Sequence, residues 1–145
     1  MDDVIGTDES QIVVIFIRDS SGQFFVHQRL ATKKTFPNLF GLGAGGHVEE
    51  GEDVHDAAKR ELREETGLTS EVTHLFTRNF NRHDLPEPRH LYVTLSDKPI
   101  ETDTAEWQWS GWMSKEEVDA LLREEKLCPD TTLLYQEYLA LESRI

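Results

Sequence analysis

The chain has 145 residues, a length typical of one compact domain with a moderate core. Its 28 acidic and 15 basic residues give a formal charge of −13, which argues against duplex DNA and anionic membranes as partners because both bind basic surfaces. One cysteine, no apolar run near the ~20 residues that span a bilayer, and an acidic N-terminus without a secretion signal together predict a cytoplasmic protein.

Two strands are predicted in the first thirty residues. Residues 12–17 form a continuous apolar run, which is typical of a strand buried on both faces. Residues 19–22 have turn composition and residues 24–28 begin a second strand, so the two predict a hairpin. After a loop with Pro37, the glycines of residues 40–46 would allow the backbone to approach a ligand closely.

A helix is predicted to follow the glycine-rich run. We expect Glu52 and Asp53 in its first turn, where negative charge is favoured, and Gly67 just past its end. Its apolar stripe repeats every four residues and consists of Val54, Ala58 and Leu62.

Three strands and two helices are predicted after this helix. The strands are residues 71–80, 90–95 and 106–112, and a proline-bearing loop separates the first two. Ser114 and Glu117 form a capping box that opens a helix. Asp130 is expected to cap a last helix that carries Leu133, Leu134, Tyr138 and Leu141.

Three carboxylates, Glu61, Glu64 and Glu65, lie three and four residues apart on the first predicted helix. Residues so spaced are neighbours on a helix surface, where like charges repel, and at 100° per residue all three share one face beside the apolar stripe. Clustered hard oxygen donors suit Mg²⁺ or Mn²⁺, which take other ligands from water and phosphate. The alternative is an ordinary solvated acidic face.

The spacing around these carboxylates matches a family signature. Residues 46–68 follow the pattern G-x5-E-x7-R-E-apolar-x-E-E-x-G-apolar and resemble the Nudix box without departure. At average residue usage the chance of this match is on the order of 10⁻⁹ per start position. The resemblance implies an α+β fold, an α/β/α sandwich around a central mixed β-sheet, as one domain over residues 1–145. It also implies metal-dependent hydrolysis of a nucleoside diphosphate linked to another group.

The resemblance also implies roles for single residues in the box. Arg60 and Glu52 resemble the pair that hydrogen-bonds across the loop and the helix to hold the metal ligands in place. The implied ligands of Mg²⁺ or Mn²⁺ are the carboxylates of Glu61, Glu64 and Glu65 and the carbonyl of Gly45.

The general base for the attacking water has two candidate sources. Glu61 or Glu64 would need only a short reach to a water beside the metal. The family also recruits an acidic residue from a loop well after the box, and the candidates there are Glu101, Asp103 and Glu106.

Substrate recognition is predicted from residue type alone. Arg29, Lys33 and Lys34 are candidates for binding phosphate, with ordinary surface cations as the alternative, and Gly46 and Glu106 are further candidate contacts. The candidates for stacking on a base are Phe36, Phe80, Trp107, Trp109 and Trp112, with the core as the alternative. The alternation of Trp107 and Trp109 predicts a strand with one packed face. Arg82, His83 and Arg89 are candidate contacts as well, with a mobile surface loop as the alternative.

Residues 28–37 resemble the Nudix subgroup closest to isopentenyl-diphosphate isomerase. The isomerase needs a cysteine where this chain has Gly45, and it departs from the box at Glu61 and Glu64; His47 matches a metal-binding histidine of the isomerase. We therefore expect a hydrolase of a small-molecule nucleotide. An isomerase and a non-catalytic nucleotide-binding sensor are the alternatives, and similar proteins are commonly homodimers.

Overall fold

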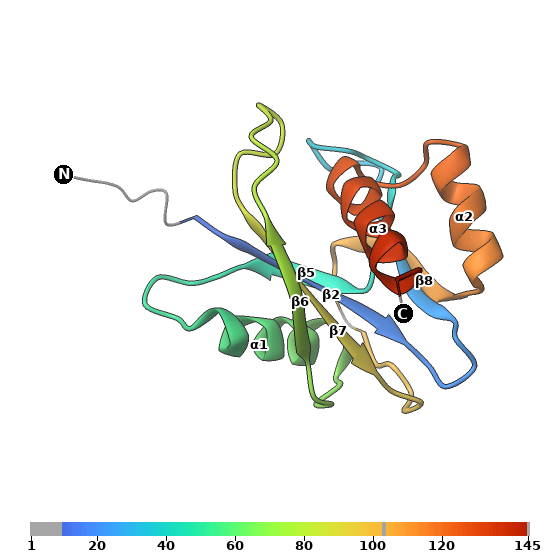
Figure 1. Ribbon diagram of the computed structural model, residues 1–145, viewed down its shortest axis with the longest axis horizontal. Helices are drawn as coiled ribbons and strands as arrows, with labels where there is room; N and C mark the ends of the chain where they lie inside the picture. Colours follow the sequence, from blue (N-terminus) through green and yellow to red (C-terminus); the bar gives the residue numbers. More distant parts are fainter. Residues whose placement is uncertain (1–9, 103, 145) are drawn as a thin grey trace.

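A computed structural model describes residues 10–102 and 104–144. Along the chain it contains β2 (Ile12–Arg18), β3 (Phe24–Arg29), β4 (Phe40–Leu42), β5 (Ala44–His47), α1 (Val54–Thr66), β6 (Thr73–Arg78), β7 (Arg89–Leu95), β8 (Trp107–Met113), α2 (Lys115–Arg123) and α3 (Pro129–Glu142) (Figure 1). None of the helices in the described residues is long and apolar enough to cross a membrane.

The strands of the described residues form one mixed sheet in which β2 is central. β2 pairs in parallel with β7 and antiparallel with β3 and β5, and the main strand order is β4-β3-β2-β7-β6. Residues 13–17 of β2 are all buried, so this strand is covered on both faces, as its apolar run predicted.

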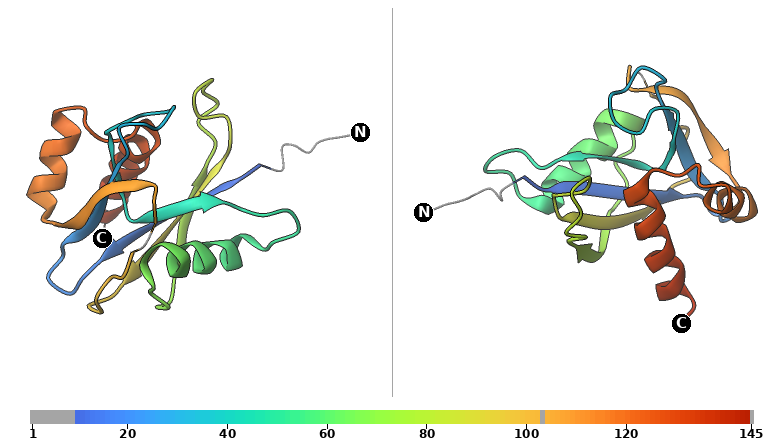
Figure 2. Two further views of the ribbon diagram at one scale, coloured as in Figure 1. Left: turned by 180° about the vertical axis from the view of Figure 1, so that it is seen from behind. Right: turned by 90° about the horizontal axis from the view of Figure 1, so that it is seen from above.

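Helices cover both faces of the sheet. Val13, Ile15 and Ile17 pack in a cluster with Ala57, Ala58 and Leu62 of α1. The alternate residues of β2 pack in a second cluster with residues from α2 and α3, among them Val118, Leu121, Leu134 and Tyr135. Figure 2 shows α1 and α3 on opposite sides of the sheet. The predicted α/β/α sandwich is therefore confirmed.

The sheet divides beside β2. β5 pairs with the first half of β2, whereas β3 meets β2 at its end, through Arg18 and Phe24, and pairs with β4 instead. The chain crosses between the two parts at Gly43, whose φ is +70°. A Cβ there would overlap the carbonyl of Ile15, so the crossing requires glycine. The predicted glycine-rich run is thus two short strands that diverge at one corner.

Helix α1 ends where the sequence predicts, but it begins at Val54, two residues later than expected. Gly67 has a φ of +77° and its N–H donates to the Arg63 carbonyl at 2.9 Å, as a left-handed C-cap does. At the other end Asp53 is the N-cap, and its side chain accepts the N–H of His55 at 3.0 Å. The placement of Glu52 and Asp53 in the first turn is wrong, because the helix starts at Val54.

The capping box of α2 is confirmed, since Ser114 and Glu117 exchange side-chain and backbone hydrogen bonds at 3.1 and 2.8 Å. The predicted cap of α3 is wrong. Cys128 occupies the N-cap position without a side-chain hydrogen bond, Pro129 begins the helix, and Asp130 lies in its first turn. The Asp130 carboxylate is instead paired with Arg89 at 3.2 Å.

The expectation that Trp107 and Trp109 share one packed face of β8 is wrong. Gln28 pairs with Trp109 and the next residue, Arg29, pairs with Trp107. Gln108 therefore has no partner in β3 and forms a bulge. Trp107 consequently packs with the cluster under α1, whereas Trp109 is 42% exposed and touches Phe40 on the other side of the sheet.

Candidate active site

Glu61 lies where α1 runs alongside β5. Its carboxylate fills the space that a Cβ on Gly46 would need, so glycine at position 46 allows the helix and strand to approach this closely. The side chain is 13% exposed. Burial raises the pKa of the Glu61 carboxyl above its ordinary value, against the opposing effect of the neighbouring Arg60 guanidinium.

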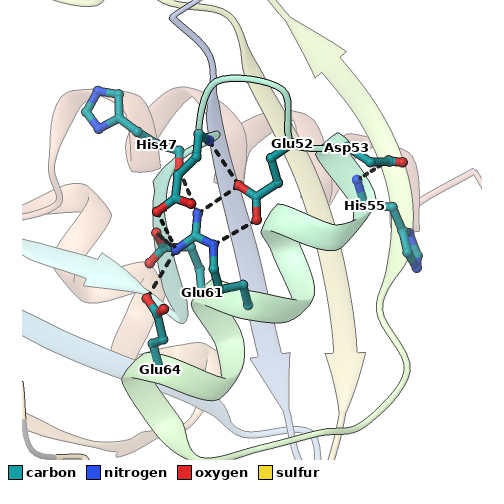
Figure 3. Close-up of polar contacts among 8 residues, drawn as sticks. His47, Glu52, Asp53, His55, Glu61 and Glu64 are labelled. Carbon is teal, nitrogen blue, oxygen red and sulfur yellow. Dashed lines mark hydrogen bonds and ion pairs between the residues drawn. The ribbon is translucent and has the colours of Figure 1, made fainter.

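Arg60 is the centre of a network that joins α1 to the loop before it. Its guanidinium forms a two-point ion pair with Glu52, at 2.8 and 3.0 Å, and donates to the His47 carbonyl at 3.0 Å. It also donates to Glu61 at 3.0 Å and to Glu64 at 3.1 Å. Figure 3 shows Glu52, Glu61 and Glu64 around this group, while the His47 ring points away. The hydrogen-bonded pair implied by the resemblance is therefore present in the structure.

The other two box carboxylates differ in burial. Glu64 is 54% exposed, at the outer end of the network. Glu65 is partly buried and accepts the backbone N–H of Gly45 at 3.0 Å. Burial raises the pKa of the Glu65 carboxyl to about 8, and the charges of Glu61 and Glu106 act in the same direction.

A divalent cation would suit this set of donors. Among residues 10–102 and 104–144, no three acidic, histidine or cysteine side chains converge on one point. The guanidinium of Arg60 lies among Glu61 and Glu64, and Glu65 is hydrogen-bonded to Gly45. The three carboxylates are nonetheless hard oxygen donors on one helix, and burial raises the pKa of Glu61 and Glu65, which makes the anionic forms of these two costly. A bound cation would remove that cost, so these residues fit Mg²⁺ or Mn²⁺.

A cavity of about 460 Å³ opens beside these carboxylates, where the sheet divides. The predicted site residues that line it are Arg29, Lys33, Gly45, Gly46, Glu65 and Glu106. Lys33 lies 3.5 Å from Glu106 across the cavity wall. The fold thus brings residues that are up to 77 positions apart in the chain onto one cavity, and it places the box at one side of it.

Several candidate contacts lie away from the cavity. Glu101 donates its N–H to the Thr66 carbonyl behind the end of α1, and Asp103 lies outside the described residues. Arg82 is paired with Asp84 at 2.7 Å in the loop between β6 and β7, and both side chains are exposed. Phe80 and Trp112 pack against the core clusters. Of the five aromatic candidates, Phe36 and Trp107 line the cavity.

Arg89 and Asp130 form a buried ion pair on the cavity wall. Arg89 is 5% exposed, so the alternative of a mobile surface loop is wrong for it. It donates to Asp130 at 3.2 Å and to the carbonyl of Glu87 at 2.7 Å. Sequence reasoning missed Asp130 as a site residue, because its partner is 41 positions away and no local pattern connects them.

His27 is a second cavity residue that sequence reasoning missed. Its ring stacks on Trp107, with centroids 4.4 Å apart, and its Nδ1 donates to the Gly43 carbonyl at 2.7 Å. Burial lowers the pKa of the His27 imidazole to about 4, so the ring is neutral at pH 7. His27 and Trp107 together close one wall of the cavity.

Comparisons with known proteins agree with this architecture. The family model described as NUDIX domain matches residues 9–133. An uncharacterised Nudix hydrolase of Streptomyces coelicolor is 29% identical over 140 residues, which cover 85% of this chain and 70% of that protein. An isopentenyl-diphosphate Delta-isomerase of Nocardia farcinica is 29% identical over 117 residues, covering 77% and 67%. A crystal structure from Deinococcus radiodurans superimposes with a TM-score of 0.76 at 24% identity, over 88% of this chain and 81% of that one.

Proposed function

The chain belongs to the Nudix family of pyrophosphohydrolases, and from that premise we propose that it hydrolyses the diphosphate linkage of a nucleotide derivative with the help of Mg²⁺ or Mn²⁺. The observation that carries the proposal is the position of the box carboxylates. Glu61 and Glu65 are crowded carboxyl groups beside a polar cavity large enough for a small ligand, and glycine at position 46 lets the Glu61 carboxylate lie against β5.

The residues of the box divide the work of catalysis. A divalent cation held by Glu61, Glu64 and Glu65 would offset the negative charge on the diphosphate. Arg60 and Glu52 hold the helix and the preceding loop together, so the carboxylates keep their spacing when the substrate enters. Lys33 lines the cavity and would contact phosphate oxygens there.

A carboxylate must also accept the proton of the attacking water. Glu106 lines the cavity, so it stays a candidate beside Glu61 and Glu64. Glu101 is a poorer candidate, because its backbone is bound to Thr66 behind the helix. The proton acceptor is therefore expected among the carboxylates that line the cavity or contact Arg60.

A substrate screen tests the proposal directly. Nucleoside di- and triphosphates, sugar nucleotides and dinucleotides are incubated with the protein and Mg²⁺ or Mn²⁺, and released phosphate and monophosphates are measured. We expect turnover of at least one compound and its loss with EDTA. Glu64→Gln should lower that turnover by orders of magnitude and leave the fold intact, because Glu64 is exposed and outside the core. Glu116→Gln on α2 is the matched control, and a fully active Glu64→Gln variant would refute the site assignment.

An isomerase is the second candidate, since one of the relatives is an isopentenyl-diphosphate Delta-isomerase. The residue at position 45 argues against it. A Cβ on Gly45 would lie 2.6 Å from the Val13 carbonyl oxygen, so this backbone has no room for the cysteine that the isomerase needs. Rearrangement of isopentenyl diphosphate without phosphate release would favour the isomerase. Tight nucleotide binding without any product would favour the sensor.

We further propose that residues 1–145 act as one domain in the cytoplasm, where a single unpaired thiol stays reduced. Cys128 is buried and burial raises the pKa of its thiol to about 12, which agrees with a structural role. We also propose a homodimer, because similar proteins are commonly dimers, and light scattering of the purified protein tests this.

A further inference from the structure

His74, Thr77 and His90 form a polar cluster on the neighbouring strands β6 and β7, and none of the three lines the cavity beside the box. Thr77 lies opposite His90 in the ladder. The Nε2 of His74 is 2.9 Å from the Thr77 hydroxyl oxygen, and the Nδ1 of His90 is 2.7 Å from the same oxygen. Two imidazole nitrogens from different strands therefore converge on one atom.

A β-bulge in β6 is what brings His74 to this cluster. His74 and Thr77 are three positions apart, and in a regular strand residues so spaced point to opposite faces. The register shifts between His74 and Phe76, so Leu75 is an extra residue without a partner in β7. The bulge therefore turns His74 to the face of Thr77 and His90. Bulges are common where a strand has to re-aim a side chain.

The ring of His90 is held through its other nitrogen. Its Nε2 donates to the side-chain oxygen of Gln11 at 2.6 Å. The proton of the neutral ring is thus on Nε2, and the lone pair of Nδ1 faces Thr77. Burial lowers the pKa of His90, and the charge of His74 acts in the same direction, so the ring is mainly neutral at pH 7. Histidines that bind metal ions are typically fixed in this way, by a hydrogen bond from the ring nitrogen that does not touch the ion.

His74 supplies the second ring from a supported but open position. It packs beside the buried ring of Tyr92, with centroids 5.2 Å apart, and its own centroid is 6.2 Å from that of His90. His74 and Thr77 are exposed, so an ion from solvent can reach the space between the two rings. The net charge of −13 favours the approach of cations.

We propose that His74 and His90 form a second cation site, for Zn²⁺ or another late transition-metal ion, apart from the box. Imidazole nitrogen suits Zn²⁺, Ni²⁺ and Cu²⁺, whereas Mg²⁺ prefers oxygen, so the two sites select different ions. The ion takes the place of the Thr77 hydroxyl between the two nitrogens, and water completes its coordination. Among residues 10–102 and 104–144, no third histidine, cysteine or acidic side chain joins the pair, so the ion exchanges with solvent. When bound, it ties the edge strand β6 to β7.

Zn²⁺ binding is tested in the double variant Glu61→Gln, Glu64→Gln with excess Mg²⁺, so that the box does not compete for the ion. Calorimetry should still show Zn²⁺ binding. NMR of the histidine rings should show the signals of His74 and His90 shifting together as Zn²⁺ is added, while the signal of His83, in an exposed loop, stays in place. This readout uses the intact pair, so it does not depend on the folding of any histidine variant.

Substitutions in the same background then measure each contribution. Gln11→Leu keeps both imidazoles but removes the hydrogen bond that fixes His90, and it should weaken Zn²⁺ binding about 10- to 100-fold. His74→Gln removes a ligand and should weaken binding more than Gln11→Leu does. His83→Gln is the matched control and should leave the affinity unchanged.

Two results would overturn the inference. One is Zn²⁺ affinity that is the same with and without the His74 imidazole, which would mean that acidic residues elsewhere hold the ion. The other is ring signals of His74 and His90 that do not move when Zn²⁺ binds. Neither result depends on hydrolysis, so the site and the proposed function stand or fall separately.

Discussion

Arg60 joins more polar groups than any other side chain of the candidate site. It pairs with Glu52 at two points and also reaches Glu61, Glu64 and the His47 carbonyl. The planar guanidinium can satisfy these acceptors at once because its donors are fixed in a fork. The neighbouring carboxylates raise the pKa of Arg60 further, so its charge is permanent.

We expect Arg60→Lys to lower metal affinity and turnover by about 10- to 100-fold, the usual effect of removing a group that orients metal ligands. A lysine keeps the charge but cannot form the two-point pair with Glu52. Mn²⁺ titration followed by activity and by calorimetry measures both quantities. Arg63→Lys, an exposed change on the same helix, is the control. Wild-type metal affinity in Arg60→Lys would contradict the positioning role.

Among single residues, the sequence identified those that belong to a local pattern of fixed spacing. The box singled out Glu52, Arg60 and Glu61, and the structure brings these three together. The sequence did not distinguish Phe36, which lines the cavity, from the other four aromatic candidates for stacking on a base. Phe36 differs from the others in its backbone, which has a positive φ in a loop held by side chains of β3 and β8. Residue type alone does not indicate such a conformation.

Among the elements, β3 carries a histidine that is buried as the neutral ring. The pKa of His27 is about 4 in the folded protein and near its ordinary value when unfolded. Between pH 6.5 and 4 the unfolded chain therefore binds a proton that the folded chain does not. The contribution of the neutral ring is fully present above pH 6.5 and is lost as the pH falls toward 4.

We expect the wild type to lose about 1–3 kcal/mol more stability than His27→Gln between pH 7.5 and pH 4.5. Urea unfolding of both proteins at the two pH values gives the difference. His83→Gln, in the exposed loop between β6 and β7, is the control and should follow the wild type. Parallel losses in the wild type and in His27→Gln would show that His27 does not titrate in this way.

The pair of Arg89 and Asp130 connects the start of β7 to the first turn of α3. Asp130→Ala should destabilise the fold by about 2 kcal/mol, because it removes a charge-assisted hydrogen bond of buried Arg89, whose charge is then left with Glu87 at 3.5 Å. Asp84→Ala, which breaks the exposed pair with Arg82, should cost less than about 1 kcal/mol. Urea unfolding measures both values, and equal effects would mean that burial does not set the cost.

For helices and strands, the periodicity of apolar residues predicted which elements exist better than it predicted the residues at which they begin and end. The apolar run of residues 12–17 became β2, and the capping box began α2. The short strands β4 and β5 were not predicted as strands, because glycine has low strand propensity and their pairing depends on distant partners in β3 and β2. The bulge at Gln108 was not predicted either, because it depends on the pairing of β8 with β3, which is distant in the chain.

For the whole molecule, the sandwich places α1 and α3 on opposite faces, and the division of the sheet leaves the cavity between them. The net charge of −13 repels an anionic substrate at long range. Divalent cations should therefore act on the protein before any substrate binds, by reducing repulsion among the box carboxylates.

We expect Mg²⁺ or Mn²⁺ alone to raise the melting temperature by several degrees, since a ligand at 100 times its Kd stabilises the native state by about 2.7 kcal/mol. Differential scanning calorimetry with and without EDTA measures this shift. The double variant Glu61→Gln, Glu64→Gln should lose it. A shift that survives in the double variant would place the stabilising ion elsewhere on this acidic surface.

The amino-acid sequence by itself indicated the family, because the spacing of residues 46–68 matches its signature, and the resemblance in turn implied the sandwich and the roles of the box carboxylates. The signature covers fewer than about 25 residues, a range in which neighbouring side chains are set by local geometry. The tertiary structure alone decided which residues surround the cavity. Asp130 pairs with Arg89, Glu106 lies 3.5 Å from Lys33, and all four of these residues line the cavity although they come from distant parts of the chain. Contacts between distant segments exist only after the layers have packed, so no local pattern records them.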